Sequence, residues 1–572
     1  MDDISIGPPP DPPTNEAQEA ADAQAGKRMA LGAIIISFFL FLGKISGYAK
    51  SMLIAGWFGG ARIAQADAYN SAYNVIVYAM YTNMEKILRP AYLPQFIREL
   101  RAGGEQQAWR LLSAILNLEL IFLVAITALL EVFAPQVIRL LWSRLASEPE
   151  NFATAVLLLR TMAPATLFLS LSLMPELTLH AYKRFALPAF GEFAFRTMLV
   201  IGMVVGVLWI WRPDNPRAIL GAALGVVLGA SMRLITMVPG LWSKFRYYRF
   251  LLNPRDVSGA ATVFSLMPPV LVGMIASALR SVADSIYADR IGEGMYTCLT
   301  FGRQMGDSSL QILPLAVSFV VYPFLSEWAA RGEKDRLADA LVGMTRVMAF
   351  IFVPISVGLM FLARPIITIM FEHGELTPER AGLSALALFC YAPGLLFFAL
   401  EGSINKWFFA LQDTKTPNYW GAAMAGLHVL IGYVGVMVLY RNGQIGGAGA
   451  LAAVSLALTV SKSLKVVVLY GLIRRQIGRI DYGKALSFAG RLGLATAAMG
   501  LTVYFIGNAL EAPLLGWTPP FMAQKLRSLA LFGAVGLGGG VVFLVVAALT
   551  RIEELAMVGG FVIRKVRGRL GR

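Results

Sequence analysis

Residues 526–550 read LRSLALFGAVGLGGGVVFLVVAALT, and this stretch decides the class of fold. Its one ionisable side chain is that of Arg527, near its start. An α-helix needs about 20 predominantly apolar residues to cross the roughly 30 Å hydrocarbon core of a bilayer. The stretch is therefore long and apolar enough to form a transmembrane helix.

Comparable apolar stretches recur along the whole chain, which predicts an all-α polytopic membrane protein with about fourteen transmembrane helices. Of the 572 residues, 57% are hydrophobic and 15% are charged, whereas soluble domains carry about 25% charged residues. A soluble protein of this size would need more charges to cover its surface. The expected spans are residues 30–57, 66–88, 108–133, 153–180, 184–211, 218–242, 260–288, 296–326, 337–362, 381–411, 418–440, 446–473, 484–509 and 526–550.

The basic residues indicate how the helices are oriented. The net charge is +15, but the cations lie in short loops and at helix ends instead of on one soluble face, which argues against a nucleic-acid partner. Alternate loops are rich in Lys and Arg, as in the loop with Lys244, Arg246 and Arg249. The positive-inside rule then places both termini in the cytoplasm.

A weak internal repeat predicts two halves. Residues 92–96, YLPQF, and 101–105, RAGGE, resemble residues 321–325, VYPFL, and 330–333, ARGE. Six expected spans separate the copies, which predicts two pseudo-symmetric six-helix bundles; chance similarity of two loops is the alternative. The expected parts are a disordered cytoplasmic tail (1–28), an N-terminal bundle (29–257), a C-terminal bundle (258–480), two additional transmembrane helices (481–551) and a basic cytoplasmic tail (552–572).

Several motifs between residues 30 and 475 occur in the order and spacing of one transporter family. They are FALQDTKTP at 409–417, FEHGELT at 371–377, KRFALPAF at 183–190 and ADAY at 66–69. In these stretches the chain resembles the MurJ/MviN family of lipid II flippases, within the MOP exporter superfamily. The family pattern has two arginines and an acid in the first span, where this chain has Lys44, Lys50 and Ser51.

The resemblance implies a transporter, not an enzyme, that moves lipid-linked peptidoglycan precursor from the cytoplasmic to the periplasmic leaflet by alternating access. It implies a role in cell-wall biogenesis, an anionic lipid-linked substrate and cell-wall synthesis proteins as candidate partners. No cofactor or metal is expected, and the membrane potential or a coupled ion is the candidate energy source. The alternatives are a flippase for another polyprenyl-diphosphate-linked saccharide, a cation-coupled small-molecule exporter of the same superfamily, and a non-transporting scaffold.

Ionisable side chains at membrane depth cost about 2.5–3.5 kcal/mol each, so they are functional candidates. A basic cavity would hold a lipid diphosphate by charge-assisted hydrogen bonds, whereas snorkelling to the interface is the structural alternative for the lysines. The i,i+4 pairs Arg280–Asp284 and Arg303–Asp307 are on one helix face and could neutralise each other, and Glu401 with Lys406 is a further candidate pair. The expected substrate-binding residues are Lys44, Lys50, Asp67, Lys86 and Arg303, with Glu85, Arg280, Asp284, Asp307 and Glu401 as secondary candidates.

Overall fold

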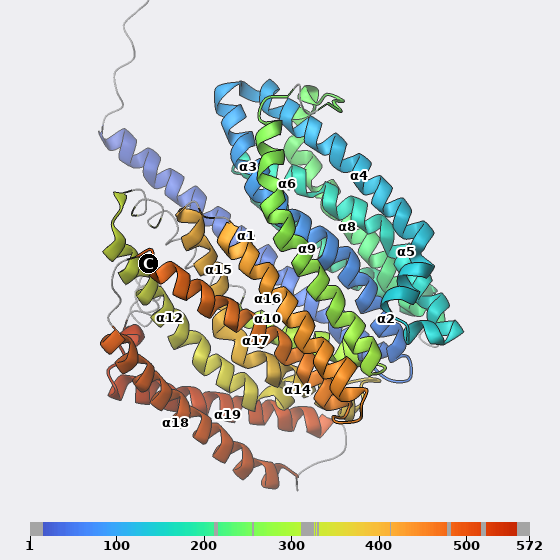
Figure 1. Cartoon of the computed structure of the whole chain (residues 1–572), viewed down its shortest axis with the longest axis vertical. Helices are drawn as coiled ribbons and strands as arrows, with labels where there is room; N and C mark the ends of the chain where they lie inside the picture. The colour runs from blue at the N-terminus through green and yellow to red at the C-terminus, as the bar shows by residue number, and fades with distance from the viewer. Residues whose placement is uncertain are drawn as a thin grey trace, which may run out of the picture.

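The computed structural model of the chain is an assembly of long helices (Figure 1). It describes residues 15–210, 215–253, 257–310, 325, 328, 331–411, 413, 415–477, 482–515 and 522–556. Helices account for nearly all of these residues, and no strand occurs among them. The all-α fold class expected from the sequence is confirmed.

The first group of helices precedes residue 258. It consists of α1 (Asn15–Phe58), α2 (Ile63–Tyr73), α3 (Thr82–Ala102), α4 (Gly104–Leu141), α5 (Pro149–Leu171), α6 (Leu173–Ala181), α7 (Ala186–Val205) and α8 (Leu220–Leu241). A π-helical segment, η1 (Asn74–Tyr81), joins α2 to α3, and a second, η3 (Gly206–Ile210), extends α7. Within this group α7 packs against α8 and α1, and α5 packs against α8 and α4.

The second group of helices follows residue 259. It consists of α9 (Ala260–Ile291), α10 (Met295–Leu310), α12 (Lys334–Phe361), α13 (Ala363–Phe371), α14 (Pro378–Tyr391), α15 (Leu395–Ala410), α16 (Lys415–Tyr433) with the π-helical η8 (Val434–Tyr440), and α17 (Gly447–Arg474). Here α16 packs against α9 and α17, and α14 packs against α10 and α17. Two further helices, α18 (Tyr482–Leu515) and α19 (Met522–Leu549), pack on each other and on α12 and α13 at the edge of the molecule (Figure 1).

Twelve helical stretches among the described residues are long and apolar enough to cross a membrane, and they match twelve of the fourteen expected spans. The other two are the expected second and eighth spans. The second falls on the continuous helical run α2–η1–α3, which carries Asp67, Glu85 and other polar residues along its length. The eighth begins as α10, and most of its expected second half, with the second copy of the repeat, lies outside the described residues.

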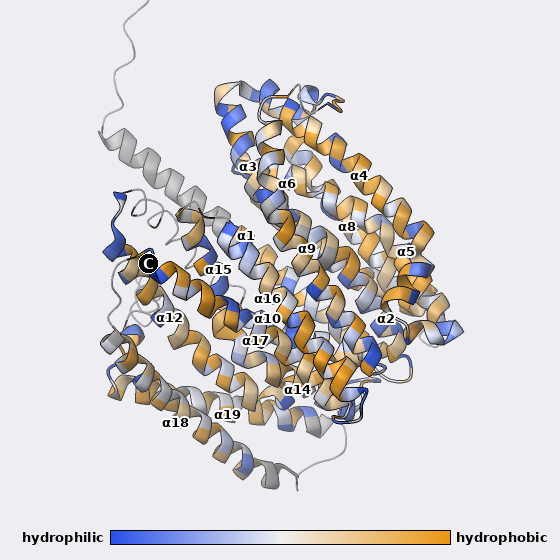
Figure 2. Cartoon of the chain, in the orientation of Figure 1, coloured by the Kyte–Doolittle hydropathy of each residue, from blue (hydrophilic) through white to orange (hydrophobic). Residues whose placement is uncertain are grey.

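The outer surface is that of a protein immersed in lipid. Large apolar side chains are exposed along the helices, among them Trp209 (83%), Leu140 (77%) and Leu537 (74%). Hydrophobic residues colour most of the length of α4, α5 and α8 in Figure 2. In water such a surface would aggregate, so the exposed apolar bands are the lipid-facing sides of a multi-pass membrane protein.

The expectation of a disordered tail at residues 1–28 is wrong for residues 15–28, because α1 begins at Asn15. Residues 15–25, NEAQEAADAQA, are rich in Ala, Glu and Gln, which are strong helix formers. Extending an existing helix costs far less than nucleating a new one, so this segment continues the first span. Residues 1–14 lie outside the described residues.

Glycines allow α7 and α8 to touch backbone to backbone. A Cβ atom added at Gly202 would lie 2.4 Å from Cα of Gly225, and one added at Gly221 would lie 2.6 Å from Cα of Gly206. Small residues at such crossings permit the close approach that stabilises helix pairs in membranes. The α7–α8 pair therefore forms a firm base for the side chains that α7 presents to α1.

Candidate functional site

The two lysines of the first span lie on α1, at its contact with α7. Gly43 and Gly47 face α7 there, and the hydroxyl groups of Ser46 and Thr197 are hydrogen-bonded across the contact at 3.1 Å. Lys44 and Lys50 are both half-buried and well inside the stretch Ile35–Phe58 that can span the membrane. Six residues of α-helix turn through about 600°, so the two ammonium groups leave α1 about 120° apart.

Lys50 lies against aromatic rings. Its Nζ is 4.4 Å from the ring centre of Tyr73 and 5.7 Å from that of Tyr69, both on α2. Such cation–π contacts stabilise a charge that has lost part of its water. Among the described residues, no ion pair engages Lys44 or Lys50. Tyrosine ring faces therefore stabilise the charge of Lys50, and no described carboxylate pairs with either lysine.

Another face of α1 contacts α10. Ser51, which stands where the family pattern has an acid, donates a hydrogen bond to Oε1 of Gln304 at 2.7 Å, and Tyr48 is hydrogen-bonded to Ser308. The contacts of α1 with α7 and its hydrogen bonds to α10 place α1 between the two groups of helices.

Arg303 does not pair with Asp307, and Asp284 does not pair with Arg280, so the expected i,i+4 pairs are wrong. Arg303 on α10 instead binds Asp284 on α9, with 2.5 Å between NH1 and Oδ2. The other carboxylate oxygen of Asp284 lies 2.7 Å from Nε2 of His428 on α16, which is fully buried. A buried carboxylate needs partners that satisfy both of its oxygens, and here Arg303 and His428 reach them from the neighbouring helices α10 and α16.

The remaining members of the two expected pairs have separate surroundings. Asp307 accepts a hydrogen bond from the hydroxyl of Tyr391 on α14. Arg280 is half-buried on α9, one turn before Asp284.

Asp67 connects the two groups of helices. Its carboxylate accepts hydrogen bonds from the backbone N–H groups of Gly294 (2.6 Å) and Thr297 (2.8 Å) and from the Thr297 hydroxyl (2.7 Å). These donors form the N-terminus of α10, where the helix dipole favours a negative charge. The structure thus uses Asp67 to hold α2 against α10, and it does not bring this side chain together with the lysines of α1.

Further contacts join the two groups at the same end of the molecule. Arg62 pairs with Glu375 at 2.8 Å, and Arg380 donates to the carbonyl oxygens of Gly59 (2.9 Å) and Gly60 (2.6 Å). The Asp289 carboxylate accepts hydrogen bonds from two backbone N–H groups of the segment that follows α4. Asp67, Arg144 and Asp289 line a small recess at this end. The loops involved belong to the set with fewer basic residues.

The segment between α13 and α14 also joins the two groups of helices at this end. His373 Nε2 lies 2.9 Å from the carbonyl oxygen of Met52 and donates to it, and the backbone N–H of Glu375 donates to the carbonyl of Gly56. Burial, together with the positive charge of Lys525, lowers the pKa of His373 below its usual value. Thr377 starts α14 by accepting a hydrogen bond from the backbone N–H of Arg380, with Pro378 as the first helical residue.

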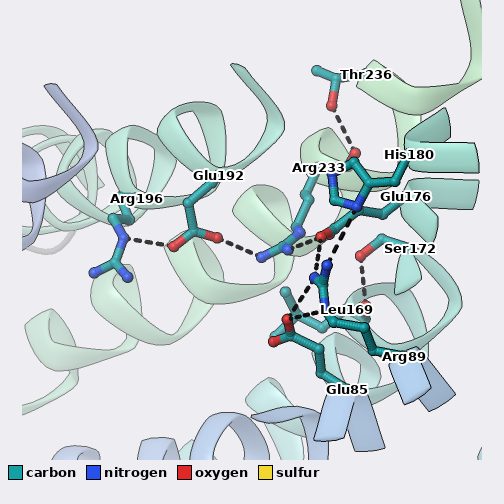
Figure 3. Close-up of polar contacts among 10 residues, drawn as sticks. All are labelled: Glu85, Arg89, Leu169, Ser172, Glu176, His180, Glu192, Arg196, Arg233 and Thr236. Atoms are coloured by element: carbon teal, nitrogen blue, oxygen red, sulfur yellow. Dashed lines mark hydrogen bonds and ion pairs between the residues drawn. The ribbon is translucent and has the colours of Figure 1, made fainter. Parts of the chain in front are cut away.

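Glu85 begins a chain of ion pairs that we call the charge ladder (Figure 3). In order, its members are Glu85, Arg89, Glu176, Arg233, Glu192 and Arg196, with N–O distances of 2.7, 3.0, 2.7, 2.5 and 2.7 Å between successive side chains. The ladder crosses from α3 through α6 and α8 to α7, and Arg233 also lies over the ring of Tyr81. The sequence contains the i,i+4 pairs Glu85–Arg89 and Glu192–Arg196, but it does not reveal that Glu176 and Arg233 join them into one connected chain.

The sequence predicts that Glu401 pairs with Lys406. In the structure Glu401 pairs instead with two lysines of α17. Its oxygens lie 2.9 Å from Nζ of Lys462 and 2.7 Å from Nζ of Lys465. Residues five apart on a helix point about 140° away from each other, so Lys406 and Glu401 lie on different faces of α15. Lys86 is part of α3, and its side chain lies outside the described residues.

Comparison with known proteins gives one consistent family. A family model described as "Lipid II flippase MurJ" matches residues 54–516. The chain is 24% identical to a probable lipid II flippase MurJ of Vibrio cholerae over 526 residues, covering 90% of this chain and 95% of the relative. It is 24% identical to the lipid II flippase MurJ of Burkholderia cenocepacia over 506 residues, covering 88% and 93%.

Solved structures share the fold. A lipid II flippase MurJ in an inward closed conformation aligns with a TM-score of 0.69 at 19% identity, covering 90% of this chain and 98% of that one. An inward-facing multidrug resistance transporter of the MATE family, in the MOP superfamily, aligns with a TM-score of 0.62 at 14% identity, covering 78% and 98%. At these identities the likeness establishes the helical architecture alone.

Proposed function

Because this chain belongs to the lipid II flippase MurJ family, we propose that it moves lipid II from the cytoplasmic to the periplasmic leaflet by alternating access. The observation that carries the proposal is the match over residues 54–516, together with two lysines at membrane depth on α1 that no described carboxylate neutralises. The protein is a transporter and not an enzyme. It acts as a multi-pass protein of the bacterial inner membrane.

The substrate is a lipid whose headgroup carries a diphosphate, and its negative charge matches the basic groups of α1. Lys44 and Lys50 supply the first contacts, each as a point charge that makes short charge-assisted hydrogen bonds. The polyprenyl tail stays in the lipid, in a groove that α18 and α19 provide. The binding site then lies between two pseudo-symmetric bundles, residues 29–257 and 258–480.

Arg303 joins the site only by exchanging its partner. Its guanidinium is now held by Asp284, which His428 also contacts. A phosphate oxygen competes with Asp284 for the same donor, and His428 remains to satisfy the carboxylate when Arg303 leaves. Arg303 therefore binds the substrate after it has left Asp284, whereas the lysines of α1 make the first contacts with the headgroup.

The closed end of the molecule is the periplasmic gate in this proposal. Both termini are cytoplasmic by the positive-inside rule, which places Arg62, Asp67, Glu375 and Arg380 on the periplasmic side. These contacts separate when the halves rock and the headgroup is released. One unit charge that moves through 100 mV gains about 2.3 kcal/mol, so the membrane potential drives the return of the unloaded, cationic site.

The test combines reconstitution with complementation. Purified protein in vesicles is assayed for transfer of lipid II across the bilayer, and the gene is expressed in a bacterium depleted of its own flippase. We expect transfer and growth with the wild-type chain, loss of both with the double variant Lys44→Ala/Lys50→Ala, and no loss with Lys334→Ala, a control lysine exposed at the end of α12.

The same assay separates the competing substrates. Transfer of a different polyprenyl-diphosphate-linked saccharide, with none of lipid II, would replace the proposed substrate by another of the same chemistry. Export of small cationic compounds without any lipid transfer would reassign the chain to the multidrug branch of its superfamily. Cell-wall synthesis enzymes that co-purify with the chain would identify its protein partners.

A further inference from the structure

The charge ladder ends at α1, beside the two lysines of the proposed substrate site. Arg196, its last member, is 40% exposed, and its Nε lies 2.7 Å from Glu192. A Cβ atom built on Gly47 would lie 3.2 Å from NH1 of Arg196, and one built on Gly43 would lie 3.5 Å from its Cδ. The Arg196 side chain thus runs along the glycine face of α1, and its guanidinium reaches the level between Lys44 and Lys50.

The three cations are close enough to repel one another. Arg196 lies against Gly47, which is three residues from Lys44 and three residues from Lys50 on α1, so the like charges of these side chains repel one another. Glu192 is shared by Arg196 and by Arg233, which is only 6% exposed and pairs with Glu176 as well. The ladder itself is balanced, with three carboxylates and three guanidinium groups, so the excess positive charge at its α1 end comes from Lys44 and Lys50.

A purely structural ladder would gain nothing from this placement. A charge at the end of an ion-pair chain is stabilised by water or by an opposite charge, and two nearby lysines are destabilising neighbours. The arrangement becomes favourable when an anion occupies the space among the three cations. A diphosphate, with several charged oxygens, is an anion of suitable size and charge.

Within the span Ile35–Phe58, α1 carries lysines but no arginine. Lysine binds phosphate as a point charge and does not fix its orientation. A guanidinium presents parallel N–H groups that bind two oxygens at once. Arg196 brings such a group from α7 to the space between Lys44 and Lys50. Glu192 and the packing of α7 on α8 fix the position of this guanidinium.

We propose that Arg196 is a substrate-binding residue that completes, with Lys44 and Lys50, a three-cation site for the diphosphate of the lipid-linked substrate. This inference rests on the proposed function, since it names a further residue of that same site. The charge ladder ties α3, α6, α7 and α8 together, and its member Glu192, on the same helix as Arg196, orients the terminal guanidinium toward the anion.

The test uses the full-length protein in detergent and in vesicles, with Arg196→Gln as the main variant and Arg89→Gln as its matched control. Arg89 belongs to the same ladder, is 39% exposed, and lies on α3 next to Glu85 and Glu176. Binding of inorganic pyrophosphate is measured by calorimetry, and lipid II transfer is measured at several lipid concentrations. We expect Arg196→Gln to weaken pyrophosphate binding at least tenfold and to raise the lipid concentration for half-maximal transfer, while Arg89→Gln leaves both unchanged.

Rescue distinguishes recognition from folding. Lys50→Arg should restore most of the affinity in the Arg196→Gln background, because it returns a guanidinium to the same space from α1. Equal pyrophosphate affinity in wild-type and Arg196→Gln protein would overturn the inference, as would equal losses in Arg196→Gln and Arg89→Gln together with equal drops in melting temperature. A wild-type chain that binds pyrophosphate through Arg196 but transfers no lipid II would refute the proposed function and leave this anion site standing.

Discussion

Replacing Asp284 by Asn tests the buried triad of the second helix group. Asp284 is 3% exposed and His428 is 0% exposed, and the side chain of Arg303 is 17% exposed. The substitution keeps the size of the side chain but removes its charge, which leaves the guanidinium of Arg303 without its counter-ion. Breaking a buried pair by removing one partner costs about 3–5 kcal/mol, so Asp284→Asn should lose roughly that much free energy of unfolding.

A second substitution separates the loss of the pair from damage to packing. In the double variant Asp284→Asn/Arg303→Gln both charges are gone, and the two amides can hydrogen-bond with each other. Neutral replacement of a whole buried pair is often tolerated, so the double variant should recover most of the stability that Asp284→Asn loses. The control is Glu333→Gln, which removes the partner of Arg336 (64% exposed) and should cost less than about 1 kcal/mol.

The assay is denaturant unfolding of the purified protein in detergent, followed by tryptophan fluorescence. The measured quantity is the free energy of unfolding of each variant relative to wild type. If Asp284→Asn is no more destabilising than Glu333→Gln, or if the double variant is less stable than Asp284→Asn, the triad is not the buried, charge-balanced unit described above.

Three further predictions concern the closed end and the helix packing. Asp67→Asn removes the charge that caps α10 and should cost about 1.5–3 kcal/mol, measured by the same unfolding assay, and it should increase the distance between spin labels placed on α2 and α10. Gly202→Ala forces a methyl group to within 2.4 Å of Gly225 and should cost about 1–3 kcal/mol through overpacking; an unchanged melting temperature would contradict the α7–α8 contact. Since the folded protein lowers the pKa of His373, the unfolded chain takes up the proton first, so stability should be complete above about pH 6.5 and fall as the pH drops below it. His373→Gln should flatten this pH dependence.

The sequence predicted the architecture because bilayer thickness imposes a length that can be counted along the chain. Twelve of the expected spans recur as helices long enough to cross, and the helix α1 ends at Phe58, one residue from its expected end. The second span was less regular than expected. Residues 74–81 form a π-helical segment within it, which apolar content does not reveal.

Ion-pair partners were predicted poorly because they depend on how the helices pack. Spacing along one helix identifies residues that share a face, as with Arg280 and Asp284, but it does not say which neighbouring helix brings a competing donor. Asp284 binds Arg303 nineteen positions away in sequence because α9 and α10 pack against each other. For Glu401 a signal was present, since Lys462 and Lys465 are three residues apart and therefore share a face of α17.

The pattern of ion pairs indicates which basic residues are available to bind the substrate. Arg233 and Lys465 are buried and Arg303 is partly buried, and each is held by a carboxylate within 2.7 Å. Such groups are already neutralised, so an incoming anion must first displace a partner. On α1, Lys50 lies against tyrosine rings instead, and Arg196 at the end of the ladder lies against Gly43 and Gly47. The cost of leaving those charges without a carboxylate has to be recovered in some state of the transport cycle, and an anion at the face that α1 shares with α7 recovers it without breaking any buried pair.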